Sequence, residues 1–306
     1  MPDVRSPTLR RRELGARLRS MRLKHEFTVE QVADQLLCSP SKVSRMETGQ
    51  RAATLRDVRD LCRIYGVTDQ AEIARLMDLA REGKQQAWWQ PYDLDYFATY
   101  VDLEQAAARL SYYHTTVVPG LLQTVDYARA MFAWSLPTAQ SAGHFAEHPH
   151  ERHDNLIEYT PERRDQLIDV RLTRQRQLLT RDPAPDLAAV IDEAVLHRMV
   201  GGPSIMAAQL RHLVEASTMP NLTLQVLPFG AGAHPAMDNI FTILEFGEGA
   251  PTVVYVEGLM GWLYLEREQE VTRYGQVLEH LRSMALSQKE TIGLIREIAA
   301  RYDGTL

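Results

Sequence analysis

Two short helices separated by a tight turn, over residues 28–36 and 40–48, constrain the fold of this chain more than any other feature. The first begins with a capping-box pattern at Thr28. The second begins with Ser39, a good N-cap, and Pro40, which suits the first helical position. Its inward face holds only Val43 and Met46. A helix with so narrow an apolar stripe packs on one side only, which leaves its Ser, Lys and Arg side chains for another partner.

Three further amphipathic helices accompany this pair. One precedes it, around Leu14 to Met21, and two follow, from Thr54 to Gly66 and from about Asp69. Their inward residues recur at helical spacing: Leu14, Leu18, Met21, Leu55, Val58, Leu61, Ile73, Leu76, Met77 and Ala80. Two helices joined by a short turn, the second thinly apolar and basic, are typical of a helix-turn-helix that places its second helix in a DNA major groove.

The charge distribution agrees with that interpretation. Residues 1–87 hold 17 Lys and Arg against 12 Asp and Glu, a net charge of +5. The remaining 219 residues hold 17 against 28, a net charge of −11. A basic head on an acidic body indicates that only the head meets a polyanion.

The segment from Ser39 to Arg51 matches the motif S-x-S-x-hydrophobic-S-R-hydrophobic-E-x-G, and residues 10–66 resemble the lambda-repressor-like, or XRE, DNA-binding domains. The sequence departs from that family's pattern at two positions. Leu37 stands where Gly is usual in the turn, and a left-handed backbone would cost Leu about 1–2 kcal/mol, which predicts a differently shaped turn. Pro40 stands where a long polar residue is common, which shifts base recognition to its neighbours.

The resemblance implies roles for individual residues. Arg45 can donate two hydrogen bonds to guanine, and Ser41 and Lys42 are the other expected base contacts. Phosphate contacts are expected from four residues, a role that Lys42 could also take: Ser39, Ser44, Gln50 and Arg51. Glu47 is expected to pair with Arg22 as a structural ion pair.

The rest of the chain predicts a larger α+β domain. Residues 1–9 form a flexible tail, 10–84 the helix-turn-helix domain, 85–95 a hinge, and 96–306 a regulatory and dimerisation domain. Its helices alternate with runs rich in β-branched and aromatic residues. The runs most typical of strands are Leu222–Leu227, Ile240–Phe246, Thr252–Glu257 and Trp262–Leu265, with weaker ones at 108–118 and 187–191. We expect a small antiparallel sheet.

Four segments of this domain occur in the same order in a family of actinomycete regulators with an XRE-type head and a C-terminal domain of unknown function. They are Val118-Pro-Gly-Leu-Leu-Gln-Thr124, Val170-Arg-Leu-Thr-Arg-Gln175, Asp192-Glu-Ala-Val-Leu196 and Val226-Leu-Pro-Phe-Gly-Ala-Gly-Ala-His-Pro235. The resemblance implies a transcriptional regulator and a small partner protein from a neighbouring gene. One recognition helix reads few base pairs, so we expect a homodimer on double-stranded DNA with an inverted-repeat operator.

Candidate ligand chemistry in the body is sparse. Four histidines between His144 and His153 could bind zinc or nickel, but a solvated loop is the favoured interpretation, and we predict no metal and no cofactor. Arg171, Arg174 and Arg176 could hold an acidic ligand or form a solvated helix face. A candidate effector pocket combines a Gly-rich loop that carries His234, Asp238 and Asn239 with Glu257 or Tyr264 facing it.

Other classes of function find little support in the sequence. It has no nucleophile elbow, HExxH motif or CxxC pair, so no enzyme is predicted. No apolar run is long enough to span a bilayer, no secretory signal opens the chain, and the two cysteines fit the cytoplasm. The alternative is a protein-interaction switch that acts mainly through a small partner protein, with DNA binding secondary.

Overall fold

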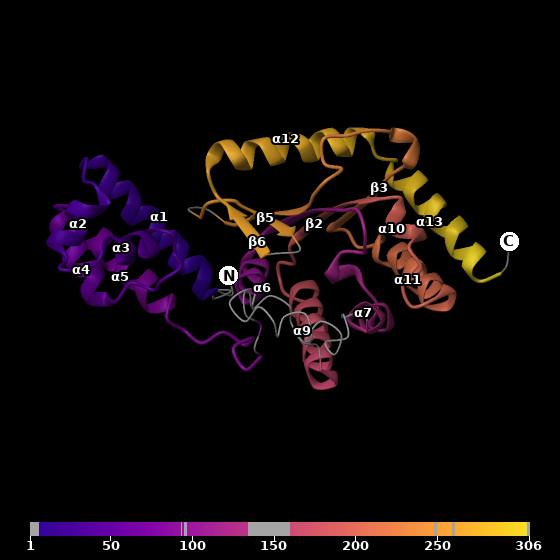
Figure 1. Cartoon of the computed structure of the whole chain (residues 1–306), viewed down its shortest axis with the longest axis horizontal. Coiled ribbons are helices and arrows are strands. Elements are labelled where there is room, and N and C mark those ends of the chain that lie inside the picture. Colours follow the sequence, from indigo (N-terminus) through magenta and orange to yellow (C-terminus); the bar gives the residue numbers. More distant parts are fainter. Residues whose placement is uncertain are drawn as a thin grey trace, which may run out of the picture. The chain divides into compact units, whose positions relative to one another are not determined.

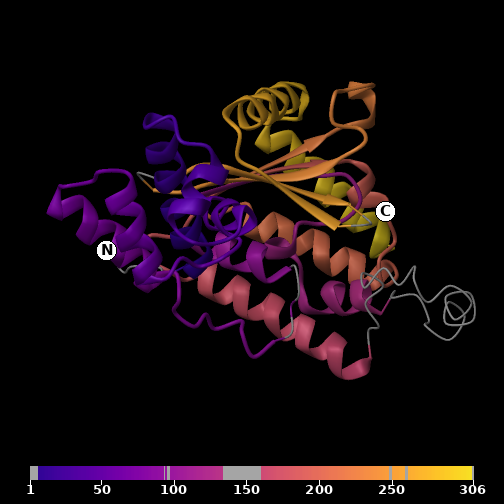
Figure 2. The ribbon, with the colours of Figure 1, turned by 60° about the vertical axis from the view of Figure 1, so that its left-hand side comes forward.

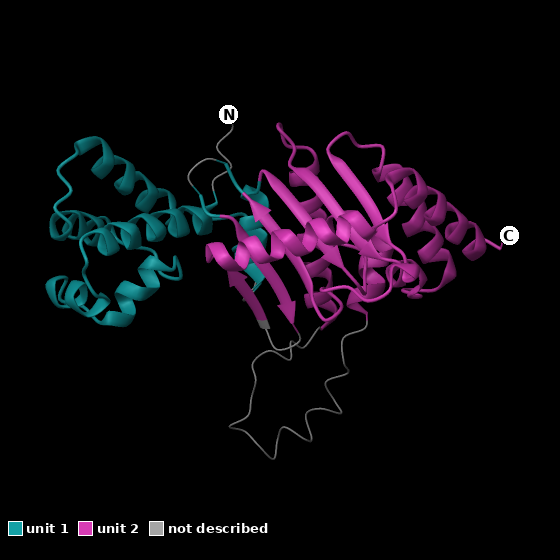
Figure 3. Ribbon diagram, turned by 90° about the horizontal axis from the view of Figure 1, so that it is seen from above, with its two compact units in different colours: residues 1–107, 246–251 teal, residues 108–245, 252–306 magenta. Residues whose placement is uncertain are grey.

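The computed structural model describes residues 6–92, 94, 97–133, 160–247, 250–258 and 261–304. The chain divides into two compact units (Figure 3), residues 1–107 with 246–251 and residues 108–245 with 252–306. Each unit has its own buried core. No helix in the described part of the chain is both long and apolar enough to cross a membrane.

In the described residues of the first unit, all regular elements are helices. Its elements are α1 (Pro7–Lys24), α2 (Val29–Gln35), α3 (Pro40–Glu47), α4 (Leu55–Ile64), α5 (Gln70–Glu82) and α6 (Phe97–Ala106). Side-chain caps fix the starts of the short helices: Thr28 and Thr54 form capping boxes, and Ser39 accepts a hydrogen bond from the Lys42 amide at 3.2 Å. Residues of the first five helices form one core, which includes Leu18, Val32, Val43, Leu61 and Leu76.

The boundaries of this unit differ from those that the sequence suggests. Helix α1 begins at Pro7, inside the expected tail, because Ser6 caps it. The Ser6 hydroxyl donates to Asp102 at 2.8 Å and the Thr8 amide donates to the same carboxylate at 2.6 Å. Asp102 lies on α6, and its carboxylate is buried at the amino end of α1, where the helix dipole favours a negative charge. These bonds join α6 to the helical head, so the first unit extends past the expected hinge at 85–95.

The second unit is built on a six-stranded sheet in the order β3-β2-β1-β4-β5-β6. The strands are β1 (Arg109–His114), β2 (Asp186–Asp192), β3 (Leu222–Leu227), β4 (Ile240–Glu245), β5 (Val253–Gly258) and β6 (Gly261–Leu265). β1 pairs with β2 and β2 with β3 in parallel, whereas β4, β5 and β6 continue the sheet in antiparallel fashion.

The expected antiparallel sheet is therefore only half right. Parallel neighbours need long crossover connections. Helices supply them: α7 (Val125–Phe132) and α9 (Pro161–Leu179) lie between β1 and β2, and α10 (Ala194–His197) and α11 (Pro203–Ala216) lie between β2 and β3. The α+β class holds, with a mixed sheet in place of the expected one.

Helices cover both faces of the sheet (Figure 1). Helix α12 (Glu268–Met284) lies on one face, and α7, α9 and α11 lie on the other, an arrangement that the rotated view repeats (Figure 2). Helix α13 (Gln288–Tyr302) packs against α11 and β3. On the α12 face, Tyr113, Phe241 and Val254 share a core with Leu278 and Leu281 of α12. Since strand residues alternate between faces, the residues directly before and after these three in their strands point to the α9 face.

Candidate nucleic-acid interface

Helix α3 buries one narrow face and exposes the other. Val43 and Met46 are 1% and 2% exposed within the core of the first unit. The opposite face carries polar side chains into solvent: Ser39, Ser41, Ser44 and Arg45, followed by Gln50 and Arg51. The Arg45 Nε donates to the Ser41 carbonyl at 3.3 Å, and the Arg45 side chain is exposed to solvent. A protruding helix with one basic and hydroxyl-rich face has the dimensions and chemistry of a major-groove reader.

The turn before α3 keeps the left-handed conformation although it contains no glycine. Leu37 has φ 53° and follows the carboxyl end of α2. Its amide donates to the Asp34 carbonyl at 3.2 Å, and the Cys38 amide donates to the Ala33 carbonyl at 2.9 Å, a Schellman arrangement. The expectation of a differently shaped turn is therefore wrong: Leu37 adopts the strained conformation, and its side chain is 93% exposed.

Arg22 and Glu47 form the ion pair that was expected between α1 and the end of α3. Arg22 Nε and Nη2 donate to the two Glu47 oxygens at 2.7 and 2.9 Å. Arg22 Nη1 also donates to the Phe27 carbonyl at 2.9 Å. Both residues are under 10% exposed, so the pair fixes α3 on α1 and is turned away from solvent.

Lys42 has a partner that the sequence interpretation overlooked. Its Nζ lies 2.6 Å from Oδ1 of Asp57, the residue that completes the capping box of Thr54 on α4. Burial alone would raise the pKa of Asp57, but Lys42 and Thr54 lower it below the ordinary value. Lys42 therefore holds α3 against α4 in this structure, whereas Arg45 and Ser41 remain exposed.

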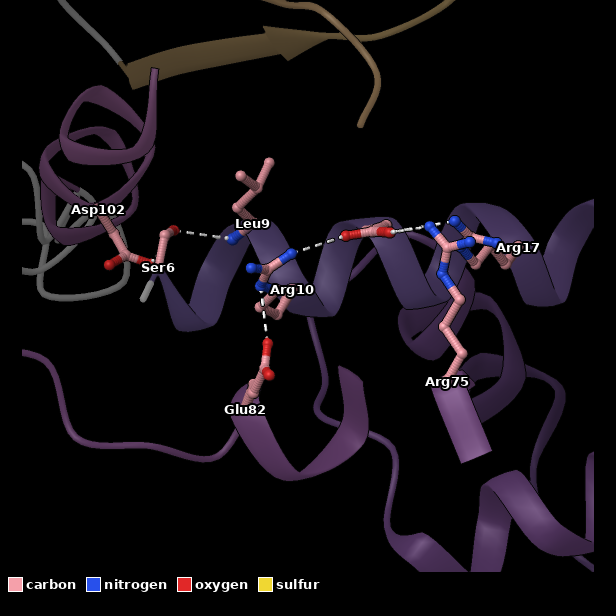
Figure 4. A network of polar contacts seen from close by, with 8 residues as sticks. Ser6, Leu9, Arg10, Arg17, Arg75, Glu82 and Asp102 are labelled. Carbon is pink, nitrogen blue, oxygen red and sulfur yellow. Dashed lines mark hydrogen bonds and ion pairs between the residues drawn. The ribbon is translucent and has the colours of Figure 1, made fainter. Parts of the chain in front are cut away.

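Other basic residues of the head are neutralised along the contact between α1 and α5 (Figure 4). The carboxylate oxygens of Glu13 lie 3.2 Å from guanidinium nitrogens of both Arg10 and Arg17, and 3.8 Å from one of Arg75. Arg10 also lies 2.8 Å from Glu82. These arginines secure α5, whereas Arg45 and Arg51 are exposed to solvent beside α3.

The residues proposed as an effector pocket are not brought together. The Tyr113 hydroxyl lies 3.3 Å from His234 Nε2, and Tyr113 belongs to the core under α12. The Tyr264 ring packs on Tyr255 with centroids 5.4 Å apart, and both residues point to the other face of the sheet, as does Glu257. Asp238 and Asn239 are exposed in the loop before β4. The sheet therefore separates His234 from Glu257 and Tyr264.

The histidines from His144 to His153 lie outside the described residues. Within the ranges that the structure describes, no three His, Cys, Asp or Glu side chains gather in a way that could hold a metal ion.

Comparison with known families gives two matches. A family model described as Helix-turn-helix domain matches residues 13–76, which confirms that the head contains a helix-turn-helix. A second family model, Domain of unknown function (DUF5753), matches residues 97–153 and 146–297. No curated protein and no solved structure matches the chain. The second match covers more than half of the chain's residues. The chain therefore belongs to the DUF5753 family, with a helix-turn-helix domain before that family's domain.

Proposed function

We propose that this protein is a sequence-specific DNA-binding transcriptional regulator, and that α3 is its recognition helix. The observation that carries the proposal is the exposed face of α3, where Ser41, Ser44 and Arg45 stand opposite the buried Val43 and Met46. Arg45 is assigned to a guanine through two hydrogen bonds, a contact that discriminates by about 1–3 kcal/mol.

The contacts around α3 suggest roles for the other polar residues on and beside this helix. Ser41 lies at the amino end of α3, near base edges or phosphate, and Ser39, Ser44, Gln50 and Arg51 are assigned to phosphates. Lys42 acts chiefly through Asp57, as a residue that positions the recognition helix. This assignment supports a head whose sequence preference depends on Arg45 and whose overall affinity depends on Arg51.

The proposal extends to assembly and signalling. One recognition helix reads a short site, so useful affinity calls for a homodimer on an inverted repeat with half-sites about 10 bp apart. The DUF5753 domain is assigned to dimerisation and to receiving a signal from a small molecule or a small partner protein. No catalytic role is assigned, and the chain is proposed to act in the cytoplasm, where it meets DNA.

The test is selection from a pool of random DNA duplexes by the full chain, with three variants. The wild type is expected to enrich one motif, Arg45→Ala to relax it at one position, and Arg51→Ala to weaken every sequence and reduce the slope of log K against log salt by about 1. Arg63→Ala is the matched control, since Arg63 is an exposed arginine six residues along α4 from Asp57. A wild type that enriches no motif, or an Arg45→Ala variant with unchanged preference, contradicts the proposal.

A further inference from the structure

Three chain segments that follow the parallel strands collect at one edge of the sheet. Strands β1, β2 and β3 are parallel, so their carboxyl ends lie together. The segments 118–124, 192–196 and 226–235 follow or overlap those ends. The chain passes outward from β1 to β2 and β3 and then returns to β4 on the other side of β1. Such a reversal of strand order is the place where open sheets with parallel strands bind ligands, outside the carboxyl ends.

The segment 118–124 is held rigidly there by three glutamines. Gln123 Nε2 donates to the Val118 carbonyl at 2.6 Å. Gln175 Nε2, from α9, donates to the carbonyls of Gly120 and Gln123 at 2.9 and 2.8 Å. Gln209 Nε2, from α11, donates to the Leu122 carbonyl at 2.7 Å. The glutamines satisfy the backbone of the segment and fix α9 against it, which sets the positions of the α9 arginines.

Two arginines of α9 meet at this edge. Arg174 is 4% exposed, and the Arg171 guanidinium lies 4.8 Å from the centroid of the Phe132 ring. Arg171 Nη1 donates to Gln123 Oε1. A Cβ built on Gly120 would lie 3.8 Å from the Arg171 guanidinium and 3.9 Å from Arg174 Nη2. The two guanidiniums thus lie side by side against a backbone without a side chain, which argues against a merely solvated face for these two arginines.

The sheet adds two polar groups from the same face. Tyr113 of β1 and Val256 of β5 pack under α12. The next residues along these strands are His114 and Glu257. Because side chains alternate between the two faces of a sheet, both point to the α9 face. Burial raises the pKa of Glu257, and the positive charges of Arg171 and Arg174 oppose that rise. The His114 Nδ1 is buried and has no hydrogen-bond partner. Burial, together with the positive charge of Arg171, lowers the pKa of His114 to about 4, so the imidazole is neutral at pH 7.

We propose that Arg171, Arg174, His114 and Glu257, here called the carboxyl-edge cluster, bind a small-molecule ligand that carries a carboxylate or phosphate group. The guanidiniums suit an oxyanion, because their forked donors match its geometry. The neutral imidazole offers one further hydrogen bond, and Glu257 suits a hydroxyl or ammonium group on the same ligand. The inference rests on the proposed function in one respect, because it names a site and a ligand chemistry for the small-molecule signal. Binding at the cluster can nevertheless be measured whether or not it changes DNA binding.

The test is calorimetric titration of the full chain at pH 7 and constant ionic strength, with citrate and inorganic phosphate as separate probes. We expect saturable binding of at least one probe, and the probe that binds distinguishes a carboxylate site from a phosphate site. Arg171→Gln should weaken binding about tenfold or more, and Glu257→Gln should tighten it several-fold, because it removes a negative charge near the oxyanion. Arg176→Gln should leave binding unchanged, because Arg176 is an exposed arginine on the same helix.

Opposite changes in Arg171→Gln and Glu257→Gln are the signature of an anion site, which a cluster that only supports the fold does not produce. Because Glu257 lies near the end of β5, its variant remains informative even if Arg171→Gln fails to fold. The absence of saturable binding for both probes, or equal affinities in the wild type and Glu257→Gln, overturns the inference. Neither result bears on motif enrichment by α3, so this inference and the proposed function fail separately.

Discussion

Leu37→Gly is expected to stabilise the head, although most substitutions in folded proteins destabilise them. Leu37 holds φ 53°, a conformation that costs a non-glycine residue about 1–2 kcal/mol. Its side chain is 93% exposed, so its removal sacrifices almost no buried apolar surface. Glycine adds about 0.5–1 kcal/mol of backbone entropy to the unfolded chain. The difference predicts a net gain of about 0.5–1 kcal/mol in the free energy of unfolding.

Amide hydrogen exchange over residues 29–65 measures this gain within the full chain. A gain of that size slows exchange of the core amides of α2, α3 and α4 about two- to fivefold. Leu37→Ala is the matched control, because it removes the same side chain but retains a Cβ in the left-handed conformation. Equal slowing in both variants would show that the Leu side chain, and not the backbone, is unfavourable. Faster exchange in Leu37→Gly would refute the reasoning altogether.

Three further predictions follow from charges in the structure. Lys42→Ala leaves Asp57 without its partner at 2.6 Å and should destabilise the head by about 1–3 kcal/mol, measured by the same exchange; unchanged exchange would return Lys42 to a purely DNA-contacting role. Glu47→Gln leaves the buried Arg22 without its counter-charge and should lower the free energy of unfolding in urea by about 3 kcal/mol. A loss smaller than that of a surface ion pair would contradict a structural role for the Arg22–Glu47 pair. His114 has its pKa lowered from 6.5 to about 4, so the unfolded chain binds the proton first and stability should fall as pH drops from 6.5 to 4. His114→Gln should remove up to about 3 kcal/mol of that fall. If the variant and the wild type lose stability identically as the pH drops, His114 is not its source.

Local patterns predicted the helical head well. The caps at Thr28, Ser39 and Thr54 and the thin apolar stripe of α3 are features of neighbouring residues, and they fixed those helices and their inward faces. The link from Lys42 to Asp57 was missed because it joins residues fifteen positions apart. The capping box at Thr54 was the available signal, since it placed a carboxylate at the amino end of α4.

The sheet was harder to predict because strand order is a property of the whole domain. β1 and β2 are interior strands, yet their residues, such as Ala188 and Ala189 of β2, carry a weaker β signal than those of β4 and β5. The direction of a strand leaves no mark on its own side chains. The candidate effector pocket assumed that a loop with His234 faces Glu257 or Tyr264, but alternation across the sheet separated His234 from Glu257.

The bond from Ser6 and Thr8 to Asp102 has a consequence for how such chains recombine. The DUF5753 match begins at residue 97, yet Asp102 lies within that match and caps the first helix of the head. A genetic exchange that joined a foreign helix-turn-helix at residues 85–95 would leave this buried carboxylate without its donors Ser6 and Thr8. An exchange at residue 107, between α6 and β1, would carry donors and acceptor together. The inherited cassette is therefore expected to be the head with α6, so that Ser6, Thr8 and Asp102 change together among relatives with different DNA-binding domains.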